Sequence, residues 1–597
     1  MTTVHHMNIL GISGLDNSVR FKEREFPNLT ARQLRIAQGL DSAAALVTHV
    51  GIGAAAAQER FCGIKATGTF PADAIRYCLD AEGLRPVDID RVAHAFDYAP
   101  FASFFDHDAY LQRQYCEVYS RQAQIAVASQ YFPDIDWESR LVAVPHHLAH
   151  AAGAFYPSGF DQSLIFVTDG MGEFTSVTLA TADQSGIHVL REIPALHSIG
   201  ILYGVVTLYL GFFMALDEYK IMGLAPYGDP YRYFNVLMDL VQCQTDGTWR
   251  IPVLLMNRTM EEKETYGGTL EALADILGPP RLPDSPVTPQ HMDIAAALQA
   301  VLQSCTLDLL RYARRETGQQ HLCMSGGVAL NCAVNGVIRR SGLFKRVYVQ
   351  PAAGDDGTAL GAALYVRHRE DSGSPPIRRQ LPLWGPAYTD AQIEVAARAR
   401  ADCTFQWFES CGDLIEAATQ HLARGEIIAW FQGRMEYGPR ALGARSILAD
   451  PRDGDMRERI NHLVKKREAF RPFAPAVTSE SAGQYFEIRT GEEEVFADML
   501  FTTQVRKAWQ ERLPAITHVD GSARVQTVAR DQHPLFWQLL HAYGERTGLP
   551  ILLNTSFNVR GQPIVRTPAE AIDTFVAAGL DALAIGNLLV TRAGAGI

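Results

Sequence analysis

Two histidines four residues apart, His146 and His150, are the residues whose type and spacing most directly indicate chemistry. On a helix, side chains at this spacing lie one turn apart on the same face, so both imidazoles can bind one metal ion. Asp169 ends an apolar, strand-like run, and Asp355 follows the strand-like residues 347–350. Two imidazoles and two strand-end carboxylates suit Fe(II), Mn(II) or Zn(II). The alternative is that one histidine faces solvent and the other fills a gap in the core.

The elements that must position these residues alternate between apolar strands and helices. In the first half, we expect strands at 8–12, 43–47, 140–144, 164–168 and 176–180. Apolar residues recur with helical spacing at 71–81, 293–317 and 361–368. Strands that end in Gly-Asp or Gly-Gly turns before helices predict a layered α/β domain with its site at the strand ends. The weakly patterned region 250–286 is a helical insertion or a loop.

A polar, proline-rich stretch at 370–376 indicates a linker, so we divide the chain near residue 375. Residues 427–431, 474–478 and 550–554 predict strands of a second α/β domain. A chain of 597 residues also exceeds the roughly 250–300 residues at which a single core stops growing.

Composition excludes some classes of protein. The net charge of -12 argues against broad binding to nucleic acid or to anionic membranes. No charge-free apolar run approaches the roughly 18 residues of a membrane helix, and no signal peptide is visible at the N-terminus. The nine cysteines show no C-x-x-C spacing. We therefore expect a cytoplasmic protein with reduced thiols.

Gly326 and Gly327 follow an apolar run and would let backbone amides approach a phosphate or a ribose, although a tight turn explains such a pair as well. Small residues at 355–361 repeat the pattern.

The second half of the chain instead gathers cations around turns and rigid neighbours: Arg440, Arg445, Lys465, Lys466, Arg467, Arg471 and Arg524. A solvated helix face explains many such runs. Arg471, however, lies between Phe470 and Pro472, which favours a fixed cation that binds phosphate or carboxylate. The polar segment 554–563 is either a turn or a set of hydrogen bonds to a planar, amide-like group.

Taken together, these motifs resemble the O-carbamoyltransferases of the nodulation/cephamycin type, which include a tobramycin carbamoyltransferase. The matching segments follow the family's order over nearly the whole chain: 59–61 with Lys65, 146–150, 168–173, 218–228, 326–331, 354–361, 438–443, 467–475 and 554–558.

The resemblance implies a fold and a reaction. The first domain, 1–375, would be like the tRNA threonylcarbamoyltransferase, a duplicated ribonuclease H-like domain of the actin/hexokinase-like ATPase fold. The second, 376–597, would be YrdC-like. Carbamoyl phosphate and ATP, with Mg, would give carbamoyl-adenylate and pyrophosphate in the second domain. The first domain would then pass the carbamoyl group to a hydroxyl of a specialised metabolite of antibiotic or toxin type, with release of AMP.

The resemblance also implies site residues. His146, His150, Asp169 and Asp355 match the family's iron-binding positions, with Asp355 preferred to Asp356 because it holds the Gly-Asp position. The nucleotide pocket of the first domain would comprise Lys65, Gly326, Gly327, Asn331 and Gly357. The carbamoyl phosphate and ATP pocket of the second domain would comprise Arg440, Lys465, Arg471, Arg524 and Ser556.

The chain departs from the family at one position. The family carries a histidine that is thought to accept the proton of the acceptor alcohol, and Leu40 stands there. An extra stretch, roughly 16–36, precedes it. Asp41 or another residue could replace the base, the acceptor could need none, or the transfer step could be lost or changed. The extra stretch could instead shape an unusual acceptor pocket.

Other functions remain as alternatives. A small-molecule kinase of the same fold would leave the histidine pair and the arginine-rich domain unexplained. A nucleotide-binding protein without transfer activity is compatible with Leu40, and the acidic charge counts against tRNA modification. The expected partners are carbamoyl phosphate, ATP and a hydroxylated acceptor, without nucleic acid or membrane; a homodimer is left open.

Overall fold

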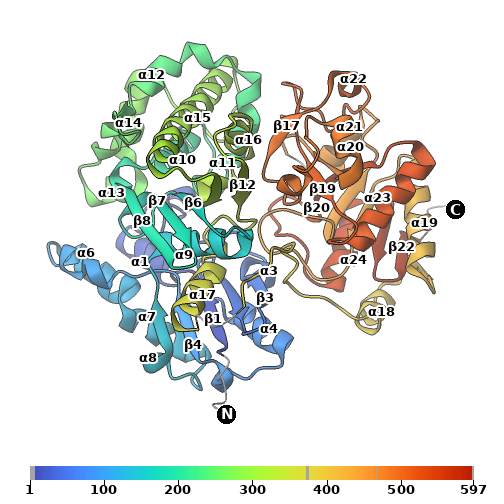
Figure 1. The fold of residues 1–597 in the computed structure, drawn as a ribbon, viewed down its shortest axis with the longest axis horizontal. Helices are drawn as coiled ribbons and strands as arrows, with labels where there is room; N and C mark the ends of the chain where they lie inside the picture. The colour runs from blue at the N-terminus through green and yellow to red at the C-terminus, as the bar shows by residue number, and fades with distance from the viewer. Residues whose placement is uncertain (1–6, 372–374, 466, 469, 594–597) are drawn as a thin grey trace. The chain divides into compact units, whose positions relative to one another are not determined.

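The computed structural model describes residues 7–371 and 375–593, apart from 466 and 469. The chain forms two compact units (Figure 1). Unit 1 comprises Met1–Glu59 and Ala66–Arg379, and unit 2 comprises Arg60–Lys65 and Gln380–Ile597. The sequence analysis divided the chain near residue 375, within the linker, and did not anticipate that a short segment of the first half belongs to unit 2.

Unit 1 contains two sheets of five strands with the same internal order. The first sheet runs β3-β2-β1-β4-β5, with β1 at Ile9–Ile12, β2 at Ala43–Val47, β3 at Ile52–Ala57, β4 at Arg91–His94 and β5 at Leu141–Ala143. Its first three strands form an antiparallel meander, and β4 and β5 continue parallel to β1.

The second sheet repeats this pattern. It runs β8-β7-β6-β11-β12, with β6 at Ser163–Thr168, β7 at Thr175–Asp183, β8 at Gly186–Pro194, β11 at His321–Ser325 and β12 at Arg346–Val349. Here β6, β7 and β8 are the meander, and β11 and β12 are the parallel strands. An α/β unit built from two such sheets has the duplicated ribonuclease H-like arrangement that the sequence analysis predicted.

Two helices, α9 (His146–Phe155) and α17 (Asp356–Glu370), pack against each other and against the sheets (Figure 1). Glycine lets their backbones meet: a Cβ at Gly361 of α17 would lie 1.8 Å from the carbonyl oxygen of Ala149 in α9. Both helices begin at the predicted metal ligands, because α9 starts at His146 and α17 starts directly after Asp355. This contact therefore sets the distance between the two ligand-bearing ends.

Unit 2 is built on a mixed sheet of eight strands in the order β13-β22-β21-β14-β15-β20-β16-β19. The strands are β13 (Cys403–Trp407), β14 (Ile428–Phe431), β15 (Arg445–Ala449), β16 (Ala474–Thr478), β19 (Gln526–Val528), β20 (Ile551–Ser556), β21 (Ala582–Ile585) and β22 (Leu588–Arg592). Helices α19 (Cys411–Ala423) and α23 (Pro534–Thr547) bury their apolar faces against this sheet, with Trp430, Phe536 and Tyr543 in the shared core.

Most elements expected from patterning are present. The strands expected in both halves correspond to β1, β2, β5, β6, β7, β14, β16 and β20, and the long helix expected at 293–317 is α15 (Pro289–Thr317). The region 250–286 contains α13 (Met260–Thr265) and α14 (Gly267–Leu277), which favours the helical alternative. By length and composition α15 could cross a membrane, but 72% of its most apolar stretch is buried inside the fold, as expected of a core helix.

Replacing Gly361 by alanine tests the contact between α9 and α17. The new methyl group meets a backbone carbonyl that cannot move without shifting α9. We expect the Gly361→Ala variant to lose about 1–3 kcal/mol of unfolding free energy, measured by urea denaturation of the full chain. Gly267→Ala is the matched control, because a Cβ at Gly267 would meet its nearest atom at 3.4 Å. Equal stability of the two variants would contradict the argument.

Candidate functional site

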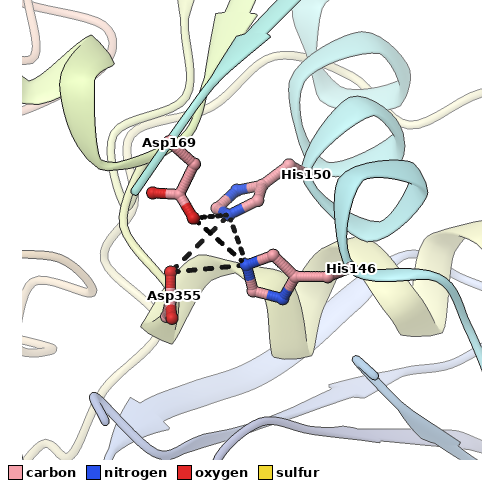
Figure 2. Close-up of side chains that lie close together, drawn as sticks. All are labelled: His146, His150, Asp169 and Asp355. Carbon is pink, nitrogen blue, oxygen red and sulfur yellow. Dashed lines mark hydrogen bonds and ion pairs between the residues drawn. The ribbon is translucent and has the colours of Figure 1, made fainter. Parts of the chain in front are cut away.

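The four predicted ligands converge on one point of unit 1 (Figure 2). Their ligand atoms all lie within 4.8 Å of one another. The Nε2 atoms of His146 and His150 are 3.1 Å apart, and the Nε2 of His146 lies 3.5 Å from carboxylate oxygens of both Asp169 and Asp355. His146, His150 and Asp169 are buried, whereas the side chain of Asp355 is 25% exposed. The site is therefore enclosed on three sides and open at Asp355.

The hydrogen bonds around the two imidazoles fit a metal ion. The Nδ1 of His146 lies 3.1 Å from the carbonyl oxygen of Ala95, which can only accept a hydrogen bond, so this nitrogen carries the proton. The Nδ1 of His150 lies 3.0 Å from the hydroxyl of Ser325, and that hydroxyl in turn donates to the carbonyl of Ala353. The Nε2 of each ring is therefore the nitrogen that faces the carboxylates and the other imidazole. A metal ion at this point would bind both Nε2 atoms and complete the site.

The spacing agrees with that interpretation. Two nitrogens at about 2.1 Å from one ion and about 90° apart lie roughly 3.0 Å from each other. The observed Nε2–Nε2 distance is 3.1 Å. With two imidazoles and two carboxylates as donors, the set suits a divalent transition metal.

The charges around the four side chains also favour a bound cation. Burial opposes a charge on His146, but the carboxylates of Asp355 and Asp169 outweigh it and raise the pKa of this imidazole well above its usual value. Burial likewise acts to raise the pKa of Asp169, and its hydrogen bond with His146 and the charges of both histidines lower it instead. The pair of buried carboxylates thus favours positive charge at the point where the four side chains meet.

His147, which lies between the two ligands in the sequence, serves a different purpose. Its Nδ1 is 2.8 Å from the hydroxyl of Thr178, and burial lowers its pKa to about 3. It is therefore a neutral core histidine, which is the alternative that the sequence analysis had weighed for one member of such a pair.

The Gly-Gly turn lies beside the metal ligands. The amide of Gly327 donates a 2.8 Å hydrogen bond to Asp169, which orients that carboxylate. Gly326 adopts a φ of +94°, and a Cβ there would lie 2.2 Å from the carbonyl oxygen of Thr168. The nucleotide role predicted for these glycines stays a prediction, and the structure adds a positioning role.

Two further residues of the predicted nucleotide pocket have structural partners. The side chain of Asn331 caps helix α16 (Cys332–Arg340) and forms a pair of hydrogen bonds with Gln299 of α15. Gly357 lies in the first turn of α17, where a Cβ would lie 1.7 Å from the carbonyl oxygen of Ala352. The close approach explains glycine at this position without reference to a ligand.

Glu173 is a supporting residue that the sequence analysis quoted within a motif but did not assign. Its buried carboxylate accepts hydrogen bonds from the amides of His146 (3.0 Å) and Asp97 (2.7 Å), at the positive end of helix α9. Phe96 stacks on the ring of His146 at 4.4 Å. The position of Glu173 four residues after Asp169 was the one signal in the sequence that could have identified it.

Asp41, the candidate replacement for the missing base, has a left-handed backbone with φ of +58°. Burial, followed by the charges of Asp356, Glu59 and Asp355, raises the pKa of Asp41 well above its usual value. Asp41 therefore interacts electrostatically with the acidic turn that carries the candidate ligand Asp355. Leu40 is buried and apolar, so the family's histidine position holds no proton acceptor.

The extra stretch 16–36 forms helices α1 (Ser18–Glu25) and α2 (Ala31–Leu34). Phe21 of α1 joins an aromatic cluster with Phe96, Tyr98, Phe105 and Tyr110. Because Phe96 also stacks on His146, this cluster connects the extra stretch to the metal ligands.

In unit 2, Lys465 and Ser556 lie together, as the pocket prediction requires. The buried Nζ of Lys465 donates to the carbonyl oxygens of Ser556 (2.6 Å) and Asn558 (3.0 Å) and to the side chain of Asn558 (2.7 Å). Burial lowers the pKa of Lys465 well below its usual value, and the charges of Arg467, Lys65 and Arg471 lower it further. Lys65, predicted for the first domain, therefore belongs to unit 2 and lies near the cations there.

Arg445 is not a substrate-binding cation. It is fully buried, donates to the carbonyls of Gln432, Gly433 and Pro386, and stacks over Phe431 with 3.6 Å to the ring centroid. The sequence analysis named Arg445 with Arg440 as a cation of this turn and did not assign it to the pocket; in the structure its donors serve backbone carbonyls. Lys466 lies outside the described residues.

Another buried carboxylate, Glu436, shapes the turn that carries Arg440. It accepts hydrogen bonds from the amides of Leu442 (2.8 Å), Ala444 (2.8 Å) and Arg445 (3.0 Å). Arg440 and Arg524 are half-buried, and Arg524 ends strand β18 (Ser522–Arg524). That they share one pocket with Lys465 stays a prediction.

Comparison with known proteins identifies the family. The sequence profile of the carbamoyltransferase N-terminus matches residues 34–364, and that of the carbamoyltransferase C-terminus matches residues 419–592. The chain belongs to the carbamoyltransferase family. It is an enzyme of the kind that transfers carbamoyl groups, as the resemblance in the sequence implied.

Two nodulation proteins are similar to this carbamoyltransferase along most of its length. NolNO of Sinorhizobium fredii is 38% identical over 596 residues, which cover 98% of this chain and 83% of that protein. NolO of Bradyrhizobium diazoefficiens is 42% identical over 455 residues, which cover 75% of this chain and 78% of that protein. Among solved structures, the activator of 2-hydroxyisocaproyl-CoA dehydratase from Clostridium difficile is 16% identical and covers 62% of this chain and 97% of its own, with a TM-score of 0.31. That score is too low to identify a shared fold.

Ser325→Ala tests whether the imidazole network holds a metal in this carbamoyltransferase. Loss of the hydroxyl frees the Nδ1 of His150 from its partner at 3.0 Å. We expect the affinity for Fe(II) or Zn(II) to fall about 10–100-fold in competition with a chelator. Ser163→Ala is the matched control, since this buried serine contacts the Sγ of Cys323 instead of a ligand. Unchanged affinity in Ser325→Ala would contradict the assignment.

Proposed function

We propose that this carbamoyltransferase is an ATP-dependent O-carbamoyltransferase that uses carbamoyl phosphate. Unit 2, as a YrdC-like domain, would form carbamoyl-adenylate, and the metal centre of unit 1 would be the place of transfer to an alcohol. The observation that carries the proposal is the buried cluster of His146, His150, Asp169 and Asp355 in a member of this family. A kinase of related fold has no evident use for two imidazoles on a helix that meet the strand-end carboxylate Asp169.

The first step would proceed in two stages. Water releases inorganic phosphate from carbamoyl phosphate and leaves carbamate, whose oxygen attacks the α-phosphorus of ATP and displaces pyrophosphate. Both substrates are polyanions that repel each other, so their approach needs cations held in place. Arg471 and Lys65, whose charges act on Lys465, would supply that positive charge, and Lys465 would hold the loop of Ser556 and Asn558 in place. Arg440, Arg524 and Ser556 are proposed as further members of the pocket.

The second step would move the carbamoyl group from the adenylate to a hydroxyl, with AMP as the leaving group. A divalent metal held by the four ligands would supply Lewis-acid activation of the mixed anhydride. Gly327 and Ser325 hold two of those ligands in place through Asp169 and His150. Fe(II) is the metal that we propose, in line with the family's positions, and Gly326, Asn331 and Gly357 would border the nucleotide.

The acceptor hydroxyl must also lose a proton. Asp41 is the acidic side chain that follows Leu40 directly, and its electrostatic neighbours Asp355 and Asp356 lie at the start of α17. We propose that it accepts this proton, once a cation among the ligands offsets the negative charge around it. The aromatic cluster that includes Phe21 of the extra stretch would form part of the wall facing the acceptor.

A pair of variants separates the two steps. Arg471→Ala removes a cation from unit 2, so release of phosphate and pyrophosphate from carbamoyl phosphate and ATP should fall to background. His150→Ala removes a metal ligand, so pyrophosphate release should continue while carbamoyl transfer is blocked. Transfer is measured as the gain in mass of a carbamoyl group on members of a panel of hydroxylated metabolites. Equal loss of both steps in both variants would contradict this division, and phosphorylation of a panel member without pyrophosphate would favour a kinase.

Asp41→Asn tests the proton acceptor, because the amide keeps the shape of the side chain and cannot take the proton. With the acceptor found in that panel, we expect transfer to slow about 10²–10⁴-fold while pyrophosphate release is unchanged. Asp106→Asn, at an exposed position of the same unit, is the control. Transfer at the wild-type rate in Asp41→Asn would assign the base elsewhere or show that the acceptor needs none.

A further inference from the structure

Two cysteines far apart in the sequence meet in unit 1, away from the metal ligands. The Sγ atoms of Cys243 and Cys305 lie 3.8 Å apart. Cys243 is exposed and Cys305 is buried. The function proposed above uses neither residue.

The meeting of these thiols is fixed by a docked hairpin. Strands β9 (Gln242–Cys243) and β10 (Trp249–Arg250) form an antiparallel pair closed by a turn at Asp246 and Gly247. The turn lies against helix α15, because a Cβ at Gly247 would lie 2.9 Å from the Cα of Leu309.

The face of α15 that contacts the hairpin extends beyond Leu309 to Tyr312. Cys305, Leu309 and Tyr312 follow one another at helical spacing, so they lie on one face. Arg191 forms an ion pair with Asp246 of the turn and stacks over the ring of Tyr312 at 5.1 Å. The buried indole of Trp249 donates to the carbonyl of His197 at 3.0 Å, which holds the other side of the hairpin. The packing of the hairpin against the helix therefore brings the two sulfurs together.

We propose that Cys243 and Cys305 form a redox-modification site, in which a low-molecular-weight disulfide converts the two thiols to a reversible disulfide that clamps the hairpin to α15. The sulfurs have to approach from 3.8 Å to the S–S bond length of about 2.0 Å.

The reaction runs by two exchanges. The Cys243 thiolate attacks glutathione disulfide, forms a mixed disulfide and releases one glutathione thiolate. The Cys305 thiol loses its proton, attacks the Cys243 sulfur and releases the second glutathione, so two protein thiols are oxidised as one disulfide is reduced to two thiols. The exposed thiol is suited to the first attack, since its hydrogen bond with Cys305 lowers the pKa of Cys243 to about 7. The buried thiol, which bulky reagents reach poorly, is suited to the second.

The test treats the full-length protein with glutathione disulfide, blocks the remaining thiols with iodoacetamide and maps unreduced peptides by mass spectrometry. We expect one cross-linked peptide pair containing Cys243 and Cys305, lighter by two hydrogens and separated again by dithiothreitol. Cys62, Cys116 and Cys411, which are also exposed, serve as internal controls and should form no intramolecular link.

Two variants make the result decisive. In Cys305→Ser the reaction should stop at glutathione bound to Cys243, and in Cys243→Ser, where the change is at an exposed site, Cys305 should remain a thiol. The proposal is overturned if Cys243 of the wild-type protein is alkylated as fully as Cys62. It is equally overturned if Cys243 retains glutathione as it does in Cys305→Ser.

Discussion

The contact between helices α9 and α17 is the constraint on which the candidate metal site depends. Gly361 lets the backbone of α17 approach that of α9, and a side chain there would meet the Ala149 carbonyl. Each helix starts at a ligand, so the separation of the helix axes fixes the distance from the histidine pair to Asp355. The second sheet supplies Asp169, which directly follows β6. A packing contact between two helices thus determines the geometry of a chemical site.

Burial makes this site selective for positive charge. Inside a protein, buried ionisable side chains are costly without compensating partners, and the fold gathers His146, His150 and Asp169 at one point. The supporting shell consists of neutral donors and acceptors: the Gly327 amide, the Ser325 hydroxyl and the Ala95 carbonyl. These groups orient the ligands and leave their inward-facing atoms available. A cation bound to these inward-facing atoms would complete the site. It would also explain why two histidines and two aspartates can lie together inside the fold.

Unit 2 handles charge in a different way. The buried cations of unit 2 have different roles. Arg445 donates to backbone carbonyls, whereas Lys465 holds the loop that contains Ser556 and Asn558. Segment Arg60–Lys65 adds a lysine to this group from the first half of the chain. Glu436 orders the turn of Arg440 through three backbone amides. The positive charge of this unit is therefore held by a polar framework in which some cations are structural.

The spacing of the two histidines and the strand-end aspartates predicted the four side chains that meet at the candidate metal site, because helical spacing and strand ends place side chains by local geometry. Short apolar runs predicted β1, β2, β5, β6 and β7 in unit 1 and β14, β16 and β20 in unit 2. Strands β3, β4 and β8 in unit 1 and β13, β15, β21 and β22 in unit 2 were not expected; β3 is alanine-rich and β8 is largely exposed. Other roles became clear only from tertiary contacts. Glu173 accepts hydrogen bonds at the start of α9, Arg445 donates to backbone carbonyls, Lys65 belongs to unit 2, and Cys243 lies against Cys305. These roles depend on contacts between segments far apart in the chain or on the direction of the backbone. No local sequence pattern predicts such contacts, because the position of each side chain is set only when the helices and strands pack together.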